Sequence, residues 1–134
     1  KLGRNALEHG IKVCYHNHGW ESIGSPSHME RLEDLTDPEN VFFCLDVGNV
    51  AQGGKDPVEV TRRIANRIKI LHIKDFKDGI FTEIGEGDVD FPLIFNILSN
   101  AGFDGWLIVE KENSPNPEKS ISIATEYLKQ YVMM

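Results

Sequence analysis

The chain has 134 residues, and its 14 Lys and Arg against 21 Asp and Glu give a formal net charge of -7 at pH 7. This length fits one domain, predicted over residues 1–134. The acidic balance, without any basic stripe, argues against nucleic acid as a partner. The lack of an apolar run near the roughly 20 residues of a membrane helix argues against a membrane.

Two features bear on the origin of the chain. Cys14 and Cys44 both lie inside apolar runs, and we interpret them as free, buried thiols of a reducing, cytoplasmic compartment. The chain starts at Lys1 rather than Met, in a segment that already has a helical pattern. We therefore expect it to be a piece of something longer.

The first third of the chain alternates helical and extended patterns. Residues 2–9 are typical of the last turns of a helix, which Gly10 closes. Residues 11–18 are predicted to form the first strand, and residues 19–27 a polar loop. A short helix is predicted over residues 29–35.

The middle of the chain repeats this alternation. The second strand is predicted over about residues 41–47, and residues 52–55 are predicted to be loop. Asp56 followed by Pro57 has the chemistry of an N-cap and first helical position. The apolar residues of this helix recur every four positions as far as Ile68.

The last part of the chain completes the pattern. The third strand is predicted over about residues 69–74, followed by an acidic loop that contains three glycines. Asp90 is the predicted N-cap of the next helix, which ends at Gly102. Residues 105–112 form the fourth predicted strand, and a final helix follows over residues 114–131.

Four strands separated by helices predict an α/β fold of the (βα)₄ type with parallel strands. Nearly continuous apolar runs also predict that both faces of the sheet are covered. Two closures are compatible with the pattern: an open doubly wound sheet, or half of a TIM (β/α)₈ barrel, which takes about 250 residues. The first strand lacks a nucleotide-type glycine fingerprint, and this favours the half-barrel.

Polar side chains follow the apolar part of each strand. Because side chains alternate along a strand and sites in parallel α/β folds lie at the carboxyl ends, one residue from each strand is expected at a common point. These are His16, Asp46, His72 and Glu110. Two imidazoles and two carboxylates suit Mn²⁺ or Zn²⁺, and also Co²⁺ or Fe²⁺, whereas Mg²⁺ prefers more oxygen. The alternatives are a turn shaped by Asp46 and a structural ion pair of Glu110 with Lys74.

Further polar residues are expected around this point. Lys74 and Glu112 lie two residues beyond the third and fourth ligands, and we predict them at the rim as substrate contacts. Trp20 and Glu21 are predicted to form one wall, with ordinary loop packing as the alternative for Trp20. The glycines of residues 85–88 resemble a phosphate loop only superficially, because two acidic residues accompany them.

Several segments together resemble a known family. They are Tyr15-His16-Asn17-His18 with Glu21, Leu45-Asp46-Val47-Gly48, His72-Ile73-Lys74-Asp75, residues 85–91, and residues 105–110. In this order they resemble the sugar phosphate isomerase/epimerase family, the xylose isomerase-like TIM barrel group that includes ketose 3-epimerases, inosose dehydratase and endonuclease IV relatives. The resemblance covers nearly the whole chain and corresponds to strands five to eight, the C-terminal half of that barrel.

The resemblance implies one divalent metal held by a residue from each strand, which carries over to the four residues named above. Many members have Glu where His16 stands, and His18 is a second candidate for this position. A His that commonly follows the Asp by three residues is Asn49 here, which alters a predicted substrate contact.

The implied activity is a metal-dependent sugar (phosphate) isomerase or epimerase that acts on a keto-sugar or polyol through an enediolate. Glu110 would be the retained base, with Glu21 or His18 as the second acid/base. A dehydratase acting on a keto-inositol or keto-sugar needs one base and one acid and fits equally well. The rivals are a noncatalytic half-barrel binding module and a phosphodiesterase akin to endonuclease IV, which the acidic charge disfavours.

A half-barrel also has consequences for assembly. It exposes two strand edges and an apolar interior, and such surfaces associate. We therefore expect either a homo-oligomer or a missing N-terminal half-barrel as the partner, with a small sugar as the substrate.

Overall fold

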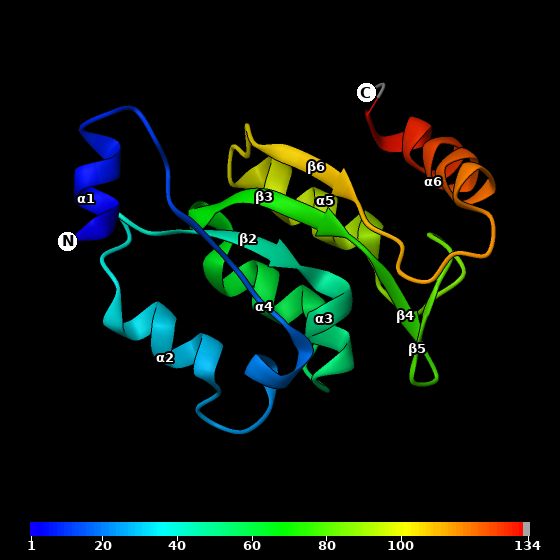
Figure 1. Ribbon diagram of the computed structural model, residues 1–134, viewed down its shortest axis with the longest axis horizontal. Coiled ribbons are helices and arrows are strands. Elements are labelled where there is room, and N and C mark those ends of the chain that lie inside the picture. The colour runs from blue at the N-terminus through cyan, green and yellow to red at the C-terminus, as the bar shows by residue number, and fades with distance from the viewer. Residues whose placement is uncertain (133–134) are drawn as a thin grey trace.

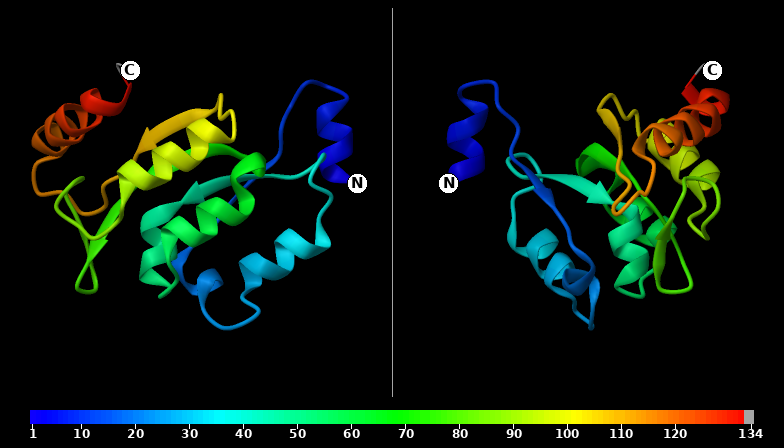
Figure 2. Two further views of the ribbon diagram at one scale, coloured as in Figure 1. Left: turned by 180° about the vertical axis from the view of Figure 1, so that it is seen from behind. Right: turned by 45° about the vertical axis from the view of Figure 1, so that its right-hand side comes forward.

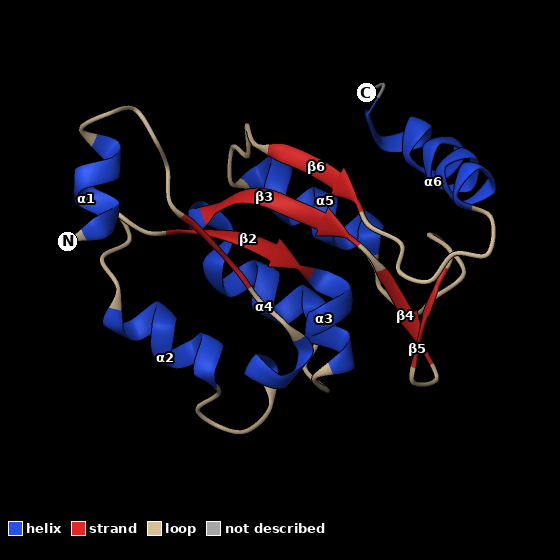
Figure 3. Cartoon of the chain, viewed as in Figure 1, coloured by secondary structure: helices blue, strands red, loops and turns tan. Residues whose placement is uncertain are grey.

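The computed structural model of the chain describes residues 1–132 (Figures 1 and 3). In chain order its elements are α1 (Leu2–Leu7), β1 (Cys14–His16), η1 (Gly19–Ser22), α2 (His28–Leu35), β2 (Phe42–Asp46), α3 (Val47–Gln52), α4 (Pro57–Ile64), η2 (Ala65–Arg67), β3 (Ile68–Ile73), β4 (Asp75–Lys77), β5 (Ile80–Thr82), α5 (Phe91–Asn100), β6 (Trp106–Val109) and α6 (Pro117–Val132). Within this part of the chain, no helix is both long enough and apolar enough to cross a membrane.

Four strands form the main sheet, in the order β1-β2-β3-β6, and every neighbouring pair is parallel. Helical segments separate each of these strands from the next in the chain, and such connections bring a chain back in the same direction. The predicted (βα)₄ architecture is therefore confirmed. The two edges of the sheet are β1 and β6.

Helices cover only one face of this sheet. In Figure 1 α4 and α5 lie behind the strands, and the reversed view in Figure 2 brings them to the front. The core lies between these helices and the strands, where Phe43, Leu45, Leu71 and Ile73 are fully buried. The prediction that both faces are covered is wrong. The other face of the sheet, to which His16, Asp46 and His72 belong, carries no helix of residues 1–132 (Figures 1 and 2).

The helix starts follow the predicted side-chain chemistry. The carboxylate of Asp56 accepts a hydrogen bond from the backbone N–H of Val58 at 2.8 Å, and that of Asp90 accepts one from Leu93 at 3.0 Å. Each satisfies a backbone donor that the first helical turn leaves free. These two N-caps fix where α4 and α5 leave the preceding loops.

Other boundaries differ from the predictions. β1 is limited to Cys14–His16, because His18 already serves as the N-cap of η1. The helix predicted as far as Ile68 ends at Ile64, and Ile68 begins β3. The predictions also missed α3, which starts directly after β2, the antiparallel hairpin of β4 and β5 within the acidic loop, and the two short 3-10 helices η1 and η2.

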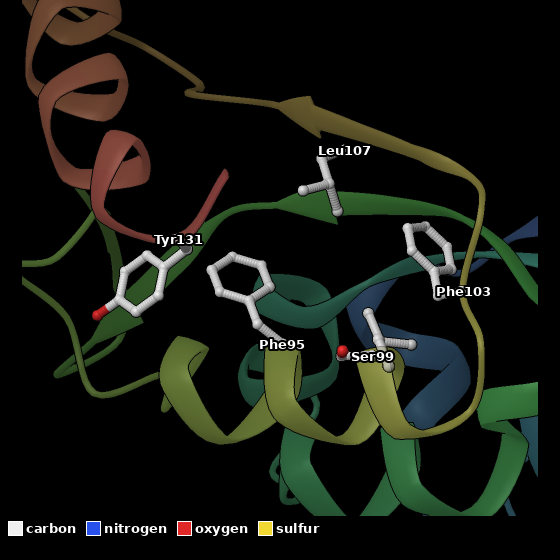
Figure 4. A pocket seen from close by; sticks show the side chains of 6 residues that line it. Phe95, Ser99, Phe103, Leu107 and Tyr131 are labelled. Carbon is white, nitrogen blue, oxygen red and sulfur yellow. The ribbon is translucent and has the colours of Figure 1, made fainter. Parts of the chain in front are cut away.

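The outermost strand, β6, is exposed on both of its faces. Trp106 is 74% exposed and Leu107 is 36% exposed, and α6 stands to one side of the strand (Figure 1). A cavity of about 210 Å³ lies between β6, α5 and α6, and Figure 4 shows Leu107, Phe95 and Tyr131 around it. No ligand predicted for the metal lines it, so we interpret it as incomplete packing at an unpaired edge.

Candidate metal centre

The four predicted ligands meet at the carboxyl ends of the strands. His16 and Asp46 end β1 and β2, His72 lies near the end of β3, and Glu110 directly follows β6. One ligand atom from each of the four lies within 4.8 Å of the others. The expected convergence is therefore found. It depends on the parallel register, which sets Asp46 beside His72.

Two buried atoms of this cluster are free to bind a cation. His16 Nε2 lies 3.6 Å from Asp46 Oδ2, and both atoms are buried without a hydrogen-bond partner among the described residues. A buried polar atom left without a partner costs free energy, about 1–3 kcal/mol. On the opposite side His72 Nδ1 lies 2.6 Å from Glu110 Oε2. The cluster thus offers two imidazole nitrogens and two carboxylates, and two of these donor atoms have no hydrogen-bond partner within residues 1–132. Such a donor set fits a divalent cation.

The protonation states suit cation binding. Burial, followed by the nearby His72, lowers the pKa of His16, so its ring is neutral near pH 7 and keeps a lone pair. Burial raises the pKa of Asp46. A bound cation would offset the cost of keeping this carboxylate charged. Burial alone would raise the pKa of Glu110, but the hydrogen bond and charge of Lys74 lower it below its ordinary value.

Lys74 does not lie at the rim, contrary to the prediction. It is only 1% exposed, and its Nζ lies 2.9 Å from Glu110 Oε1 and 3.6 Å from Asp46 Oδ2. It also pairs with Glu112, whose side chain is 47% exposed. The close packing of Gly48 against Lys74 leaves no room for a Cβ, which would lie 2.7 Å from the Lys74 carbonyl oxygen. The alternative ion pair with Glu110 is therefore found, and Glu112 is the member of the group that reaches the surface.

Asn17, which we did not predict, holds the first two ligands together. Its side-chain amide donates to the Asp46 carbonyl at 3.0 Å and accepts from the Asp46 N–H at 2.8 Å. Because β1 ends at His16, this amide continues the ladder in place of a backbone group. Asn49 donates from its side chain to the Asn17 carbonyl. Asn49 is 5% exposed, so the structure uses it to support Asn17 and does not bring it to the open side of the cluster.

The loop after β1 is organised around Glu21. Its carboxylate accepts hydrogen bonds from the Tyr15 hydroxyl and from the backbone N–H of His18, and His18 Nδ1 lies 3.3 Å from Glu21 Oε2. The His18 side chain is 61% exposed, and its ring lies 5.1 Å from that of His16. Glu21 is thus placed behind His18 and outside the metal cluster. Trp20 is exposed, and its ring lies 5.6 Å from that of His28 in an edge-to-face arrangement.

The glycines of residues 85–88 do surround an anion, but it belongs to the protein. The buried carboxylate of Asp75 accepts hydrogen bonds from the backbone N–H groups of Gly85 and Gly87, both at 2.9 Å, and also from Phe76 and Val89. A Cβ on Gly87 would lie 2.0 Å from Asp75 Oδ1. This network fixes the loop after the hairpin and leaves no place for a phosphate.

Comparison with known proteins adds a family and its relatives. The model of the family described as xylose isomerase-like TIM barrel matches residues 1–131. An inosose dehydratase of Clostridium tetani is 34% identical over an alignment of 152 positions, which covers 97% of this chain and 51% of that protein. The chain thus spans about half the length of the relatives it matches.

Solved structures agree on the fold. A sugar phosphate isomerase/epimerase from Parabacteroides distasonis superposes with a TM-score of 0.78 at 30% identity, covering 97% of this chain and 49% of that one. The IOLI protein, solved with a zinc atom, superposes with a TM-score of 0.69 at 22% identity, covering 99% of this chain and 54% of the IOLI chain. This second similarity shows the fold alone. The four parallel strands with their helices are therefore half of a TIM barrel, as predicted.

Proposed function

Because the chain belongs to the xylose isomerase-like TIM barrel family, we propose that it carries the metal centre of a dehydratase, which removes water from a keto-inositol or keto-sugar. The relatives named inosose dehydratase favour this reaction over the isomerase or epimerase activity expected from the sequence. The observation that carries the proposal is the set of two imidazoles and two carboxylates within 4.8 Å.

The ligands proposed for the cation are His16, Asp46, His72 and Glu110. Zn²⁺ and Mn²⁺ suit a mixed nitrogen and oxygen donor set best. A divalent cation at this point supplies Lewis-acid polarisation of a substrate carbonyl. Asn17 and Asn49 keep Asp46 in place from behind.

Dehydration requires one group that removes a proton and one that supplies a proton. We assign Glu110 as the base that takes the proton from the carbon next to the carbonyl. The electron pair of that C–H bond forms a double bond, and the hydroxyl group on the next carbon leaves as water with a proton from His18. His18 suits this task because its ring is exposed on the side of His16, and Glu21 orients it through Nδ1.

The remaining predicted residues take supporting roles in this proposal. Glu112 reaches the surface beside the cluster and contacts substrate hydroxyl groups. Lys74 holds Glu112 and Glu110 in position. Trp20, exposed on the loop after β1, forms an outer wall, and Asn49 acts on the substrate only through Asn17.

Metal content tests the site. Asp46→Asn and His72→Gln should each lose stoichiometric zinc in elemental analysis, while keeping the circular dichroism spectrum of the folded chain. His9→Gln is the matched control, because His9 is exposed in the turn after α1 and its ring contacts the Asn5 carbonyl, away from the cluster. Folded variants that retain the full metal content would refute the ligand assignment.

The products test the reaction. The zinc-loaded protein is incubated with a keto-inositol, and mass spectrometry should find a product lighter by one water, absent after chelation and with His18→Phe. A product of unchanged mass but altered chromatographic mobility would indicate isomerisation or epimerisation instead. Stoichiometric zinc without turnover of the keto-inositol or of a panel of keto-sugars would favour the noncatalytic binding module.

We also propose that a second copy of the chain covers the open half-barrel. The edges β1 and β6 are unpaired within residues 1–132, and the uncovered face exposes Trp106 and Ile108. Unpaired edges and apolar patches associate. Sedimentation equilibrium should give twice the 15.1 kDa chain mass, and Trp106→Lys should shift it towards the monomer. A well-folded monomer at micromolar concentration would refute this assembly and leave an N-terminal half-barrel as the partner.

A further inference from the structure

A second set of ligands overlaps the four-residue cluster. Cys44 Sγ and one nitrogen each of His16 and His72 lie within 4.8 Å of one another. Cys44 is the register partner of His16 across β1 and β2, and it lies two residues before Asp46 on the same face of β2. The thiol therefore lies one layer deeper than the carboxylates, against the same two imidazoles.

The surroundings of Cys44 shield it from solvent and set it beside an unpartnered nitrogen. The residue is 6% exposed, so competing thiols and bulk oxidants reach it poorly. His16 Nε2 and Asp46 Oδ2 are buried without a hydrogen-bond partner among the described residues, and Asp46 is 0% exposed. His16 belongs to both ligand sets, so its unpartnered nitrogen is available to either, whereas both oxygens of Glu110 already contact His72 and Lys74.

The chemistry of His16, His72 and Cys44 determines which cations this set of donors binds best. A thiolate with two imidazoles is a soft donor set that suits Zn²⁺, Co²⁺ and Cd²⁺, whereas Mn²⁺ and Mg²⁺ prefer oxygen. The ligand form is the thiolate, so the ion must displace the thiol proton. Only a cation with a strong preference for sulfur does so readily.

We propose that Cys44 is a metal ligand of this chain, and that it makes the centre selective for thiophilic divalent cations. His16, His72 and Cys44 supply two nitrogens and a sulfur within 4.8 Å of one another, and they share both imidazoles with the four-residue centre. The inference rests on the metal centre proposed above and deepens it. It gives Cys44 a role in metal binding that does not follow from the fold or from the four ligands at the carboxyl ends of the strands.

Cobalt substitution tests this inference without any turnover assay. The metal-free protein is titrated with Co²⁺, and absorption spectra are recorded. The unmodified protein should show a sulfur-to-cobalt charge-transfer band in the near ultraviolet at one equivalent. Cys44→Ser should lose the band but still bind Co²⁺ through visible ligand-field absorption. Cys14→Ser is the matched control and should keep the band. Cys14 lies on the same face of β1 as His16, but it belongs to neither ligand set.

Competition between metals gives a second readout. The ratio of Zn²⁺ to Mn²⁺ affinity should fall at least about tenfold in Cys44→Ser, or about 1.4 kcal/mol, and remain unchanged in Cys14→Ser. Cobalt bound without a sulfur band, or a band that survives in Cys44→Ser, would overturn the role of Cys44 while leaving the four-residue centre intact. A protein that binds no Co²⁺ or Zn²⁺ would overturn the metal centre and this inference together.

Discussion

Replacing Asn17 with alanine tests how the structure holds its first two ligands. Asn17 is 1% exposed, and its amide pairs with both the N–H and the C=O of Asp46. The substitution leaves these two backbone groups buried without partners, and each costs about 1–3 kcal/mol. We expect the free energy of unfolding to fall by about 2–6 kcal/mol, a large part of the stability of a domain of this size.

Urea denaturation followed by circular dichroism measures this loss. It is carried out in chelator and at one fixed protein concentration, because metal binding and association both shift apparent stability. The matched control is Asn100→Ala, since Asn100 is exposed and bonds only Asn96 at 3.3 Å; it should stay within about 0.5 kcal/mol of the unmodified protein. Asn17→Ala should also weaken zinc binding, because Asp46 and His16 are no longer tied together. A loss below about 1 kcal/mol with unchanged zinc affinity would refute the reasoning.

Two further substitutions address the charges around the site. Lys74→Met removes a cation that lies 2.9 Å from a carboxylate oxygen of Glu110. Isothermal titration should therefore find zinc binding at least about tenfold tighter, with Lys77→Met as the exposed control. Weaker zinc binding would contradict competition between the Lys74 amine and the metal for this carboxylate. Burial alone would raise the pKa of Glu21, but the hydrogen bonds that its carboxylate accepts lower it. Its contribution to stability is complete above its unfolded pKa of 4.5 and is lost as the pH falls through the lower folded value. Glu21→Gln should therefore flatten the loss of stability between about pH 5 and pH 3 in urea titrations, and an unchanged slope would contradict the assignment.

Local chemistry made much of this protein predictable. Asp56 and Asp90 mark their helices because a side-chain oxygen satisfies a free backbone donor only at that position. The alternation of side chains along a strand set His16, Asp46, His72 and Glu110 on equivalent faces before any neighbour was known. These features depend on residues close in the sequence, and they were sufficient to indicate the (βα)₄ fold and the four convergent residues.

Other features depend on which segments become neighbours. The position of Lys74 in the sequence predicts a rim residue, but its burial follows from the carboxylate at the end of β2, from two carboxylates in the segment after β6, and from its close packing against Gly48. The loop after the hairpin of β4 and β5 is fixed because the Asp75 carboxylate accepts hydrogen bonds from backbone N–H groups more than ten residues away. Neither contact leaves a periodic signal in the sequence.

The sequence by itself determined the order of strands and helices and the side of each strand on which a polar group falls, because these follow from backbone periodicity and local hydrogen bonding. Only the tertiary structure decided that the Asn17 side chain pairs with the backbone of Asp46, that Cys44 approaches two imidazoles, and that β6 is exposed at the edge of the sheet. The physical reason is that strand register and edge position arise from contacts between segments that are distant in the sequence. Such contacts bring atoms within bonding distance, but they leave no local sequence pattern from which they could be predicted.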